Sequence, residues 1–542
     1  MASAPPGARP ALKSWRGAIK RHRILAAIPV VLAAALSSAA SRALAQEDVK
    51  PVEPAREEAR RHSWALTPSL SVSETYTDNV YLTPEGTQTP DWVTQLVPAI
   101  SVQSIGPRLR LDAVYAPQIM HYARTDRKDN VFQKLDAVGT LEVSDNLLFL
   151  EAGAKVDQYD VSLRGPITES NVNITDNRAT ALTSYVSPYL RRDIGSGARV
   201  EARYTHSRWR SDEDQQTLPD NDAGRILLKV ESGPAYRAFS WKTQYTSEEI
   251  RYVTDQKTTS QVFLVDGRQL MTPTVGLLMQ AGYERYDTGI AFDALEDPRW
   301  SLGLDWTPTP RSRIAATAGK RLDENAYGFE FRHRTRVSYW TATYSEDVTT
   351  ARSQFFVPAT ASTSGTLDQM FRTQYPDPAE RQRAVQAFLA STGLPPTLGE
   401  PVNFFSDELF LRKRWSASVG LRGAKNTLFL GGFWDLRRAL TESTPLPGDF
   451  ETSNSIRMTG VSAAWSWQMT PRTIWNLEAS YTHNDFLDTD QVDNYTFLRA
   501  GFTRQLQQRL SASLFYRRQQ MRSNVAINYV ENAGIATLKM IF

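Results

Sequence analysis

Histidines are the first residues to consider for chemistry, because the chain has no cysteine and so lacks thiolate nucleophiles, thiolate metal sites and disulfides. The six histidines stand singly, outside any metal-binding spacing, at His22, His62, His121, His206, His333 and His483. A Ser/His or Asp/His set can still form across strands, since such sets follow geometry rather than spacing. Nothing in the sequence indicates one, and no Gly-rich phosphate loop is present. We therefore predict no catalytic residue, no metal site and no cofactor.

A group of charged residues alternates with apolar ones along segments that read as strands. Its members are Arg110, Asp112, Lys242, Asp305, Glu478 and Arg499. If these strands close into a barrel, the charged side chains face the lumen. Their mixed signs differ from the single-charge rings of an ion-selective pore. Such a wall suits a neutral or weakly charged hydrated chain such as a polysaccharide, although any water-filled barrel needs polar residues inside.

The segment 347–407 is too long for a loop without structure of its own. Within it, a helix is predicted over 378–391 from an N-terminal cap, a first-position proline and an apolar stripe. The residues that carry this prediction are Asp377, Pro378, Phe388 and Leu389. The helix is either a gate folded into the lumen or a cap over the barrel mouth. The gate is favoured, because wide barrels are generally plugged.

These residues must be positioned by strands, since apolar residues recur at every second position through the mature chain. Trp300, Leu302, Leu304 and Trp306 alternate with polar residues, and Trp475 to Tyr481 repeats the pattern. Short Gly-, Pro- and Asn-containing links alternate with longer polar ones such as 161–176. Short turns at one end and long loops at the other are typical of a transmembrane barrel.

The predicted fold is all-β, a single large antiparallel up-and-down transmembrane barrel. Counting strands gives about 22, within a range of roughly 18 to 24, with both termini periplasmic. The parity of this count requires 326–345 to be a hairpin bent near His333. The barrel is expected over 65–542, preceded by a short periplasmic segment over 46–64.

The last strand alternates in the same way and ends on an aromatic residue, with Leu538, Met540 and Phe542 on one face. It resembles the closing strand of bacterial outer-membrane barrels, and the resemblance implies that it is the signal read by the barrel-assembly machinery. Many soluble proteins also end on a strand, so this feature depends on the rest of the pattern.

Residues 1–45 read as a cleaved secretory signal peptide, with a basic start, an apolar run and a small-residue cleavage site. The cleavage site is formed by Ala43, Ala45 and Gln46. A transmembrane anchor is the alternative, but the apolar run is short for spanning a bilayer. Removing its seven basic residues leaves 55 Lys and Arg against 59 Asp and Glu, so the mature chain is acidic. We therefore predict no nucleic-acid partner.

Two local motifs carry a family resemblance. The first is Tyr76-Thr77-Asp78-Asn79-Val80, which follows Pro68-Ser69-Leu70-Ser71-Val72, and the second is 344–350. With the barrel pattern, they resemble the outer-membrane β-barrel proteins associated with PEP-CTERM sorting and exopolysaccharide systems. The resemblance implies an outer-membrane protein of a Gram-negative cell linked to exopolysaccharide production or export, and it brings no catalytic residues.

The function expected from this resemblance is a channel or accessory pore for exopolysaccharide export. The alternatives are a general porin or uptake channel and a structural barrel that conducts nothing, with a barrel enzyme more distant. The expected partners are outer-membrane lipid and lipopolysaccharide, the barrel-assembly machinery, exopolysaccharide and periplasmic export components.

Overall fold

The computed structural model describes residues 63–125, 130–212, 220–253, 256–289, 294–350, 352–353, 363–372, 374–392, 409–440 and 453–542. The predicted signal peptide, with Ala43, Ala45 and Gln46, lies outside these residues, and so does nearly all of the segment 46–64.

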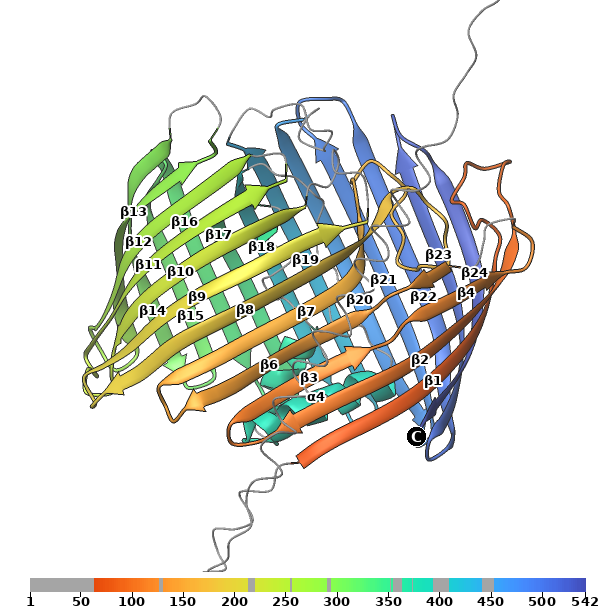
Figure 1. Ribbon diagram of the computed structural model, residues 1–542, viewed down its shortest axis with the longest axis horizontal. Helices are drawn as coiled ribbons and strands as arrows, with labels where there is room; N and C mark the ends of the chain where they lie inside the picture. The colour runs from red at the N-terminus through yellow and green to blue at the C-terminus, as the bar shows by residue number, and fades with distance from the viewer. Residues whose placement is uncertain are drawn as a thin grey trace, which may run out of the picture.

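The described chain forms one closed antiparallel sheet that curls into a wide barrel (Figure 1). Its segments are β1 (Ser63–Thr77), β2 (Asp91–Ile105), β3 (Leu109–Tyr115), β4 (Gln118–Tyr122), β5 (Asn130–Phe132), β6 (Leu135–Ser144), β7 (Leu148–Asp160), β8 (Arg178–Ile194), β9 (Ala198–Ser211), β10 (Asn221–Ser232), β11 (Phe239–Tyr252), β12 (Lys257–Leu270), β13 (Val275–Asp287), β14 (Leu295–Thr309), β15 (Ser312–Arg321), β16 (Glu324–Arg334), β17 (Ser338–Thr350), β18 (Leu409–Arg422), β19 (Asn426–Ala439), β20 (Ser455–Thr470), β21 (Thr473–Phe486), β22 (Val492–Gln507), β23 (Leu510–Ser523) and β24 (Tyr529–Ile541).

The strand count follows from two interruptions in the sheet. β3 and β4 both pair with β2, so they are two parts of one strand. β6 and β5 pair with those same two parts and form the next strand. The barrel therefore has 22 strands, which confirms the predicted all-β barrel. The predicted hairpin near His333 is present as β16 and β17.

The barrel closes where β24 pairs with β1, from Ser69 opposite Ile541 to Thr77 opposite Ala533. The backbone N–H of Phe542 adds a hydrogen bond to the carbonyl of Pro68 at 2.9 Å. The last strand thus closes the barrel. The alternate residues Leu538, Met540 and Phe542 have exposed side chains, on the outward face of the wall.

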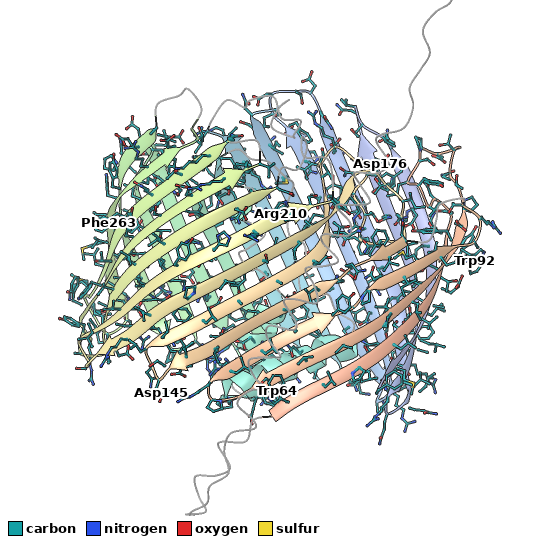
Figure 2. The ribbon with its side chains drawn as sticks, viewed as in Figure 1. Trp64, Trp92, Asp145, Asp176, Arg210 and Phe263 are labelled. Carbon is teal, nitrogen blue, oxygen red and sulfur yellow. The ribbon has the colours of Figure 1, made fainter. Side chains whose placement is uncertain are left out.

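Large apolar side chains on the outer surface alternate with inward polar ones. On β14, Trp300 and Leu302 are about half exposed, whereas Asp305 is 2% exposed. Figure 2 shows Trp92 and Phe263 projecting outward from the wall. An apolar belt around a closed barrel with a polar interior is the arrangement of an outer-membrane protein. The end of the barrel at which every connection is short then faces the periplasm, and the other end carries the long loops. No helix among the described residues is long and apolar enough to cross a membrane.

A charge placed on this belt is expected to destabilise the barrel. Leu302 lies near the middle of β14, and Leu302→Arg should lower stability by ~2–4 kcal/mol, the usual cost of arginine at the bilayer midplane. The adjacent Ser301 faces the lumen, so Ser301→Arg is the matched control and should cost much less. The urea midpoint of the folded barrel in lipid vesicles measures both. Equal urea midpoints for the two variants would show that Leu302 does not lie on the lipid-facing surface.

Candidate functional site

Two segments fold from the extracellular end of the wall into the lumen (Figure 1). The first is the connection between β7 and β8, residues 161–177, which we call the lid loop. The second is a helical hairpin made of α3 (Thr363–Phe371) and α4 (Pro378–Thr392), from the connection between β17 and β18. Both start at the same end of the barrel, but they contact its wall at different depths.

The helical hairpin packs on the inner wall near the periplasmic end. Leu367 and Phe371 of α3 and Val385 of α4 form a buried cluster with Phe429 of β19 and Ala464 of β20. In Figure 1 the helices lie inside the barrel, toward the end that carries the C-terminus. The hairpin therefore lies within the lumen rather than over the extracellular mouth.

Polar contacts join the hairpin to the opposite wall. The Gln386 side chain of α4 donates to Asp112 Oδ2 at 3.0 Å and accepts from Gln103 Nε2 at 2.8 Å. Within the hairpin, Arg381 bonds Asp368 at 2.6 Å and so ties α4 to α3. The hairpin thus bridges β2 and β3 to β18–β20 across the periplasmic end of the lumen. The predicted lumen residue Asp112 is one of its anchors.

The residues from which the helix is predicted form its N-cap, its first position and its packing contacts. Asp377 Oδ1 accepts from the Glu380 backbone N–H at 2.8 Å, which makes Asp377 the N-cap, and Pro378 begins α4. Phe388 lies edge-on to Phe371, with ring centroids 5.7 Å apart, and Leu389 packs against the same cluster. The sequence does not predict α3, because its nine-residue segment TSGTLDQMF is short, contains a glycine and has no acidic residue in its first turn.

The sequence predicts the lid loop only as a long polar link, yet its apolar residues anchor it across the lumen. Leu163 packs in a cluster with residues of β18–β21 such as Phe410. Ile167 packs beside Tyr529 of β24, and Val172 and Ile174 join a cluster at the ends of β1, β2 and β4. In the sequence, the only sign of this anchoring is a few apolar residues at irregular spacing within a polar segment.

Buried polar contacts hold the lid loop to β23 and β24. The carboxylate of Glu531, which is fully buried, accepts from Arg517 Nη2 at 2.6 Å and from Asn173 Nδ2 at 3.1 Å. Gln519 Nε2 donates to Asn173 Oδ1 at 3.0 Å. The Tyr529 hydroxyl donates to the carbonyl of Ile167. The lid loop is therefore fastened to the inner side of the wall at several points along its length.

Glu169 is an exposed carboxyl of the lid loop. Desolvation by the surrounding barrel nevertheless raises its pKa, while the guanidinium groups of Arg178 and Arg517 act in the opposite direction.

The residues of the first family motif fasten the closing seam of the barrel. The Thr77 hydroxyl donates to Glu531 Oε1 at 2.8 Å. Asp78 accepts from the Asn532 backbone at 2.7 Å and from its side chain at 2.8 Å. Both bonds link the end of β1 to β24, so this part of the motif has a clear structural role.

The other half of the motif shapes the turn after β1. The Asn79 amide bonds the carbonyls of Thr83, at 2.7 Å, and Val530, at 3.0 Å. Val80 is fully buried, and its carbonyl accepts from the Ile174 N–H of the lid loop at 2.8 Å. The motif therefore joins the closing seam to the lid loop.

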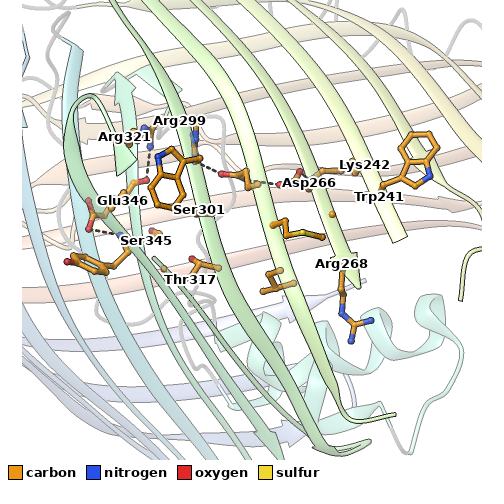
Figure 3. A pocket seen from close by; sticks show the side chains of 18 of the residues that line it. Trp241, Lys242, Asp266, Arg268, Arg299, Ser301, Thr317, Arg321, Ser345 and Glu346 are labelled. Carbon is orange, nitrogen blue, oxygen red and sulfur yellow. Dashed lines mark hydrogen bonds and ion pairs between the residues drawn. The ribbon is translucent and has the colours of Figure 1, made fainter. Parts of the chain in front are cut away.

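Charged side chains line the wall of β11–β16 (Figure 3). Lys242 pairs with Asp266 at 2.9 Å, and Asp305 is held by Arg268 at 2.7 Å and Arg313 at 2.9 Å. A hollow of about 560 Å³ lies over this wall. Arg313 also pairs with Glu330 at 3.2 Å, so three cations lie beside three anions and the wall presents a polar surface without one dominant sign.

The predicted lumen residues do not form a single site. Lys242 and Asp305 share the wall of β11–β16, while Arg110 and Asp112 lie on β3 near the hairpin. Glu478 and Arg499 face each other across the β21–β22 ladder, and the Arg499 guanidinium lies 4.1 Å from the Phe515 ring centroid. Among the described residues, no group of three or more His, Asp or Glu is placed to hold a metal ion.

Known proteins resemble this chain in structure alone. No family model matches the chain, and no curated protein matches it. Similar solved structures include the siderophore receptor PirA from Acinetobacter baumannii, with 7% identity over 89% of this chain and 81% of that one and a TM-score of 0.48. The FrpB iron transporter from Neisseria meningitidis has 8% identity over 88% and 81%, with a TM-score of 0.48. The ferric-catecholate receptor Fiu from E. coli K12 has 10% identity over 88% and 81%, with a TM-score of 0.46.

These neighbours correct one prediction. The barrels that this chain resembles are named as siderophore receptors and iron transporters, which contradicts exopolysaccharide export and the link to a PEP-CTERM system. The uptake alternative stands closer to them. The family resemblance itself is not tested by these comparisons and stays a prediction.

Proposed function

We propose that this chain is an outer-membrane uptake channel for small polar solutes, with a lumen narrowed at two depths. The observation that carries the proposal is the docking of the helical hairpin, through Gln386, across the periplasmic end of the lumen. A hairpin that bridges opposite walls restricts passage between them. The lid loop adds a second obstruction toward the extracellular end.

The wall of β11–β16 supports the chemistry of the proposed solute. Its charges occur as compensated pairs such as Lys242 with Asp266, so a solute of one charge gains little from it. The hollow of about 560 Å³ has the size of a small-molecule site. Together these features favour neutral or zwitterionic polar molecules. The proposed route to the membrane passes through cleavage after Ala45 and the barrel-assembly machinery.

Liposome swelling tests the proposal. Purified protein in phosphatidylcholine vesicles should admit monosaccharides, and the swelling rate should fall steeply as the sugar grows to a tetrasaccharide. Heat-denatured protein in the same vesicles is the control. Absence of swelling with every sugar would overturn the channel and favour a structural barrel. Equal swelling with all sugars would show an open lumen and so contradict the constriction.

A further inference from the structure

The backbone ladder between β16 and β17 stops halfway. Pairing runs from Arg334 opposite Tyr339 to Phe329 opposite Tyr344, and it goes no further. Both strands continue beyond this point, β16 back to Glu324 and β17 on to Thr350. The barrel wall is therefore split between β16 and β17 along its extracellular half. By contrast, the nearby β14–β15 ladder is paired from Trp300 onward.

Side chains bridge the split in place of a ladder. Arg321 donates to the Glu346 carbonyl at 2.7 Å, and the Tyr327 backbone N–H donates to the Glu346 carboxylate at 3.3 Å. Lys413 pairs with Glu346 at 3.7 Å and with Glu324 at 3.3 Å. These contacts can open without breaking strand hydrogen bonds, so this seam separates more easily than a paired one.

The hollow over β11–β16 extends to this split. Its lining includes Ser301, Thr317 and Glu346 (Figure 3). It also includes Tyr327 of β16 and Tyr344 of β17, one on each side of the split. The hollow thus connects the lumen wall to a stretch where the backbones of two neighbouring strands are unpaired.

The two sides of the split differ in chemistry. The hydroxyls of Ser240, Ser301, Thr317 and Ser345 line the hollow, and among the described residues they have no hydrogen-bond partner. On the outward side, Tyr327 is 53% exposed. Trp415 lies beside the seam with its ring centroid 4.9 Å from that of Tyr344. Hydroxyls inside and aromatic rings outside match a molecule with a polar head and an apolar tail.

The charges around the hollow determine the kind of head group. Its three cations lie beside three anions: Arg299 and Arg321 share Glu284, Arg321 also lies 3.8 Å from Asp347, and Lys413 pairs with Glu346. A charged head group would have to displace one of these partners, while an uncharged one needs only the free hydroxyls.

We propose that the β16–β17 split is a lateral portal between the membrane and the lumen. It admits an amphipathic molecule whose uncharged, hydroxylated head binds in the hollow while its apolar tail stays in the lipid. This proposal does not depend on passage of solutes along the barrel axis.

Cysteine labelling of the full chain in phosphatidylcholine vesicles tests the portal, because the native chain has no cysteine. Ser301→Cys lines the hollow, and Thr246→Cys is its control, on the lumen face of β11 between fully paired strands. A maleimide carried on a dodecyl chain through a glucosyl head should label Ser301→Cys about tenfold faster than Thr246→Cys, because an intact wall offers no lateral path. A sulfonated water-soluble maleimide should label both at similar rates, which corrects for access through the lumen.

Two further arms make the result decisive. Adding Glu346→Gln should speed amphiphile labelling of Ser301→Cys and leave Thr246→Cys unchanged, since it weakens the bond from the Tyr327 N–H to the Glu346 side chain across the split. Equal amphiphile rates at the two cysteines, after correction with the water-soluble reagent, would overturn the portal. Equal rates for glucosyl-headed and sulfonate-headed amphiphiles at Ser301→Cys would overturn the assignment of an uncharged head group. All rates are compared on protein that migrates as a folded barrel on an unheated gel.

Discussion

Replacing Gly420 with leucine is expected to raise the sugar permeability of the barrel severalfold. Gly420 lies on the inner face of β18, directly under α3. A Cβ at this position would stand 2.7 Å from Thr366 Cγ2 and 2.9 Å from Met370 Sδ. A leucine side chain therefore has no room while α3 is docked, and it must push the hairpin away from the wall.

The expected size of the effect follows from the cost of overpacking. Inserting a side chain into a filled contact typically costs ~1–3 kcal/mol. A change of that size shifts the ratio of docked to undocked hairpin by ~5–150-fold. The barrel wall itself should persist, because the β18 ladders to β17 and β19 are made by the backbone. Liposome swelling with a tetrasaccharide is the most sensitive readout, since the docked hairpin excludes it.

A glycine on the other face of the wall provides the control. A Cβ added at Gly534 of β24 would have nothing within 4 Å, so Gly534→Leu adds the same bulk without touching the hairpin. It should leave swelling rates unchanged. If Gly420→Leu also leaves them unchanged while the barrel stays folded, the hairpin does not limit permeation.

The opposite manipulation locks the hairpin. Gln103→Cys with Gln386→Cys places two thiols where the side chains now meet at 2.8 Å, in a chain with no other cysteine. A short reducible crosslinker between them should lower the swelling rate below that of the native chain, and reduction should restore it. Unchanged swelling on crosslinking would show that the hairpin does not move during permeation.

The barrel is predictable from sequence because its signals are local. Alternation such as Leu302 to Trp306, tight turns and the terminal Phe542 each depend on neighbouring residues, and together they indicate the strand count and the hairpin near His333. The α4 helix is predictable for the same reason, since Asp377 caps it three residues before Glu380. Structural features that depend on a local pattern can therefore be predicted from the sequence.

The candidate site is not predictable in this way, because its contacts join residues far apart in the chain. The sequence places Asp112 toward a solute, but in the barrel it anchors Gln386 of α4, 274 residues away. Thr77 and Asp78 read as a family signature, yet their partners Glu531 and Asn532 show a role in closing the seam. Such pairings depend on the register of the closed barrel, which alternation alone does not determine.

The charged residues illustrate the same limit for function. Lys242 and Asp305 each pair with an oppositely charged residue on an adjacent strand, Asp266 and Arg313 respectively. A wall that neutralises itself presents dipoles and hydroxyls to the solute. Counting its charges from sequence therefore overstates its electrostatic effect on transport.

Truncating Glu531 is expected to have the largest effect on stability of any single change at the closing seam. Its fully buried carboxylate accepts from Arg517, from Thr77 of β1 and from Asn173 of the lid loop. Glu531→Ala leaves the Arg517 side chain, which is 4% exposed, without its counter-charge. Removing one partner of a buried ion pair costs ~3–5 kcal/mol. The urea midpoint of the reconstituted barrel should fall accordingly.

Two further variants distinguish the cost of breaking the ion pair from the cost of losing a side chain. Arg518→Ala removes the exposed arginine next to Arg517, which donates to Asn532 Oδ1 at 2.9 Å. This change should barely lower the urea midpoint. Arg517→Leu combined with Glu531→Leu removes both charges, so it should recover much of the loss, because no uncompensated charge stays buried. If the double variant were no more stable than Glu531→Ala, the cost would lie in the lost bonds to Thr77 and Asn173. The carboxylate would then act chiefly as the acceptor that joins β1, β24 and the lid loop, and the seam and the lid would loosen together.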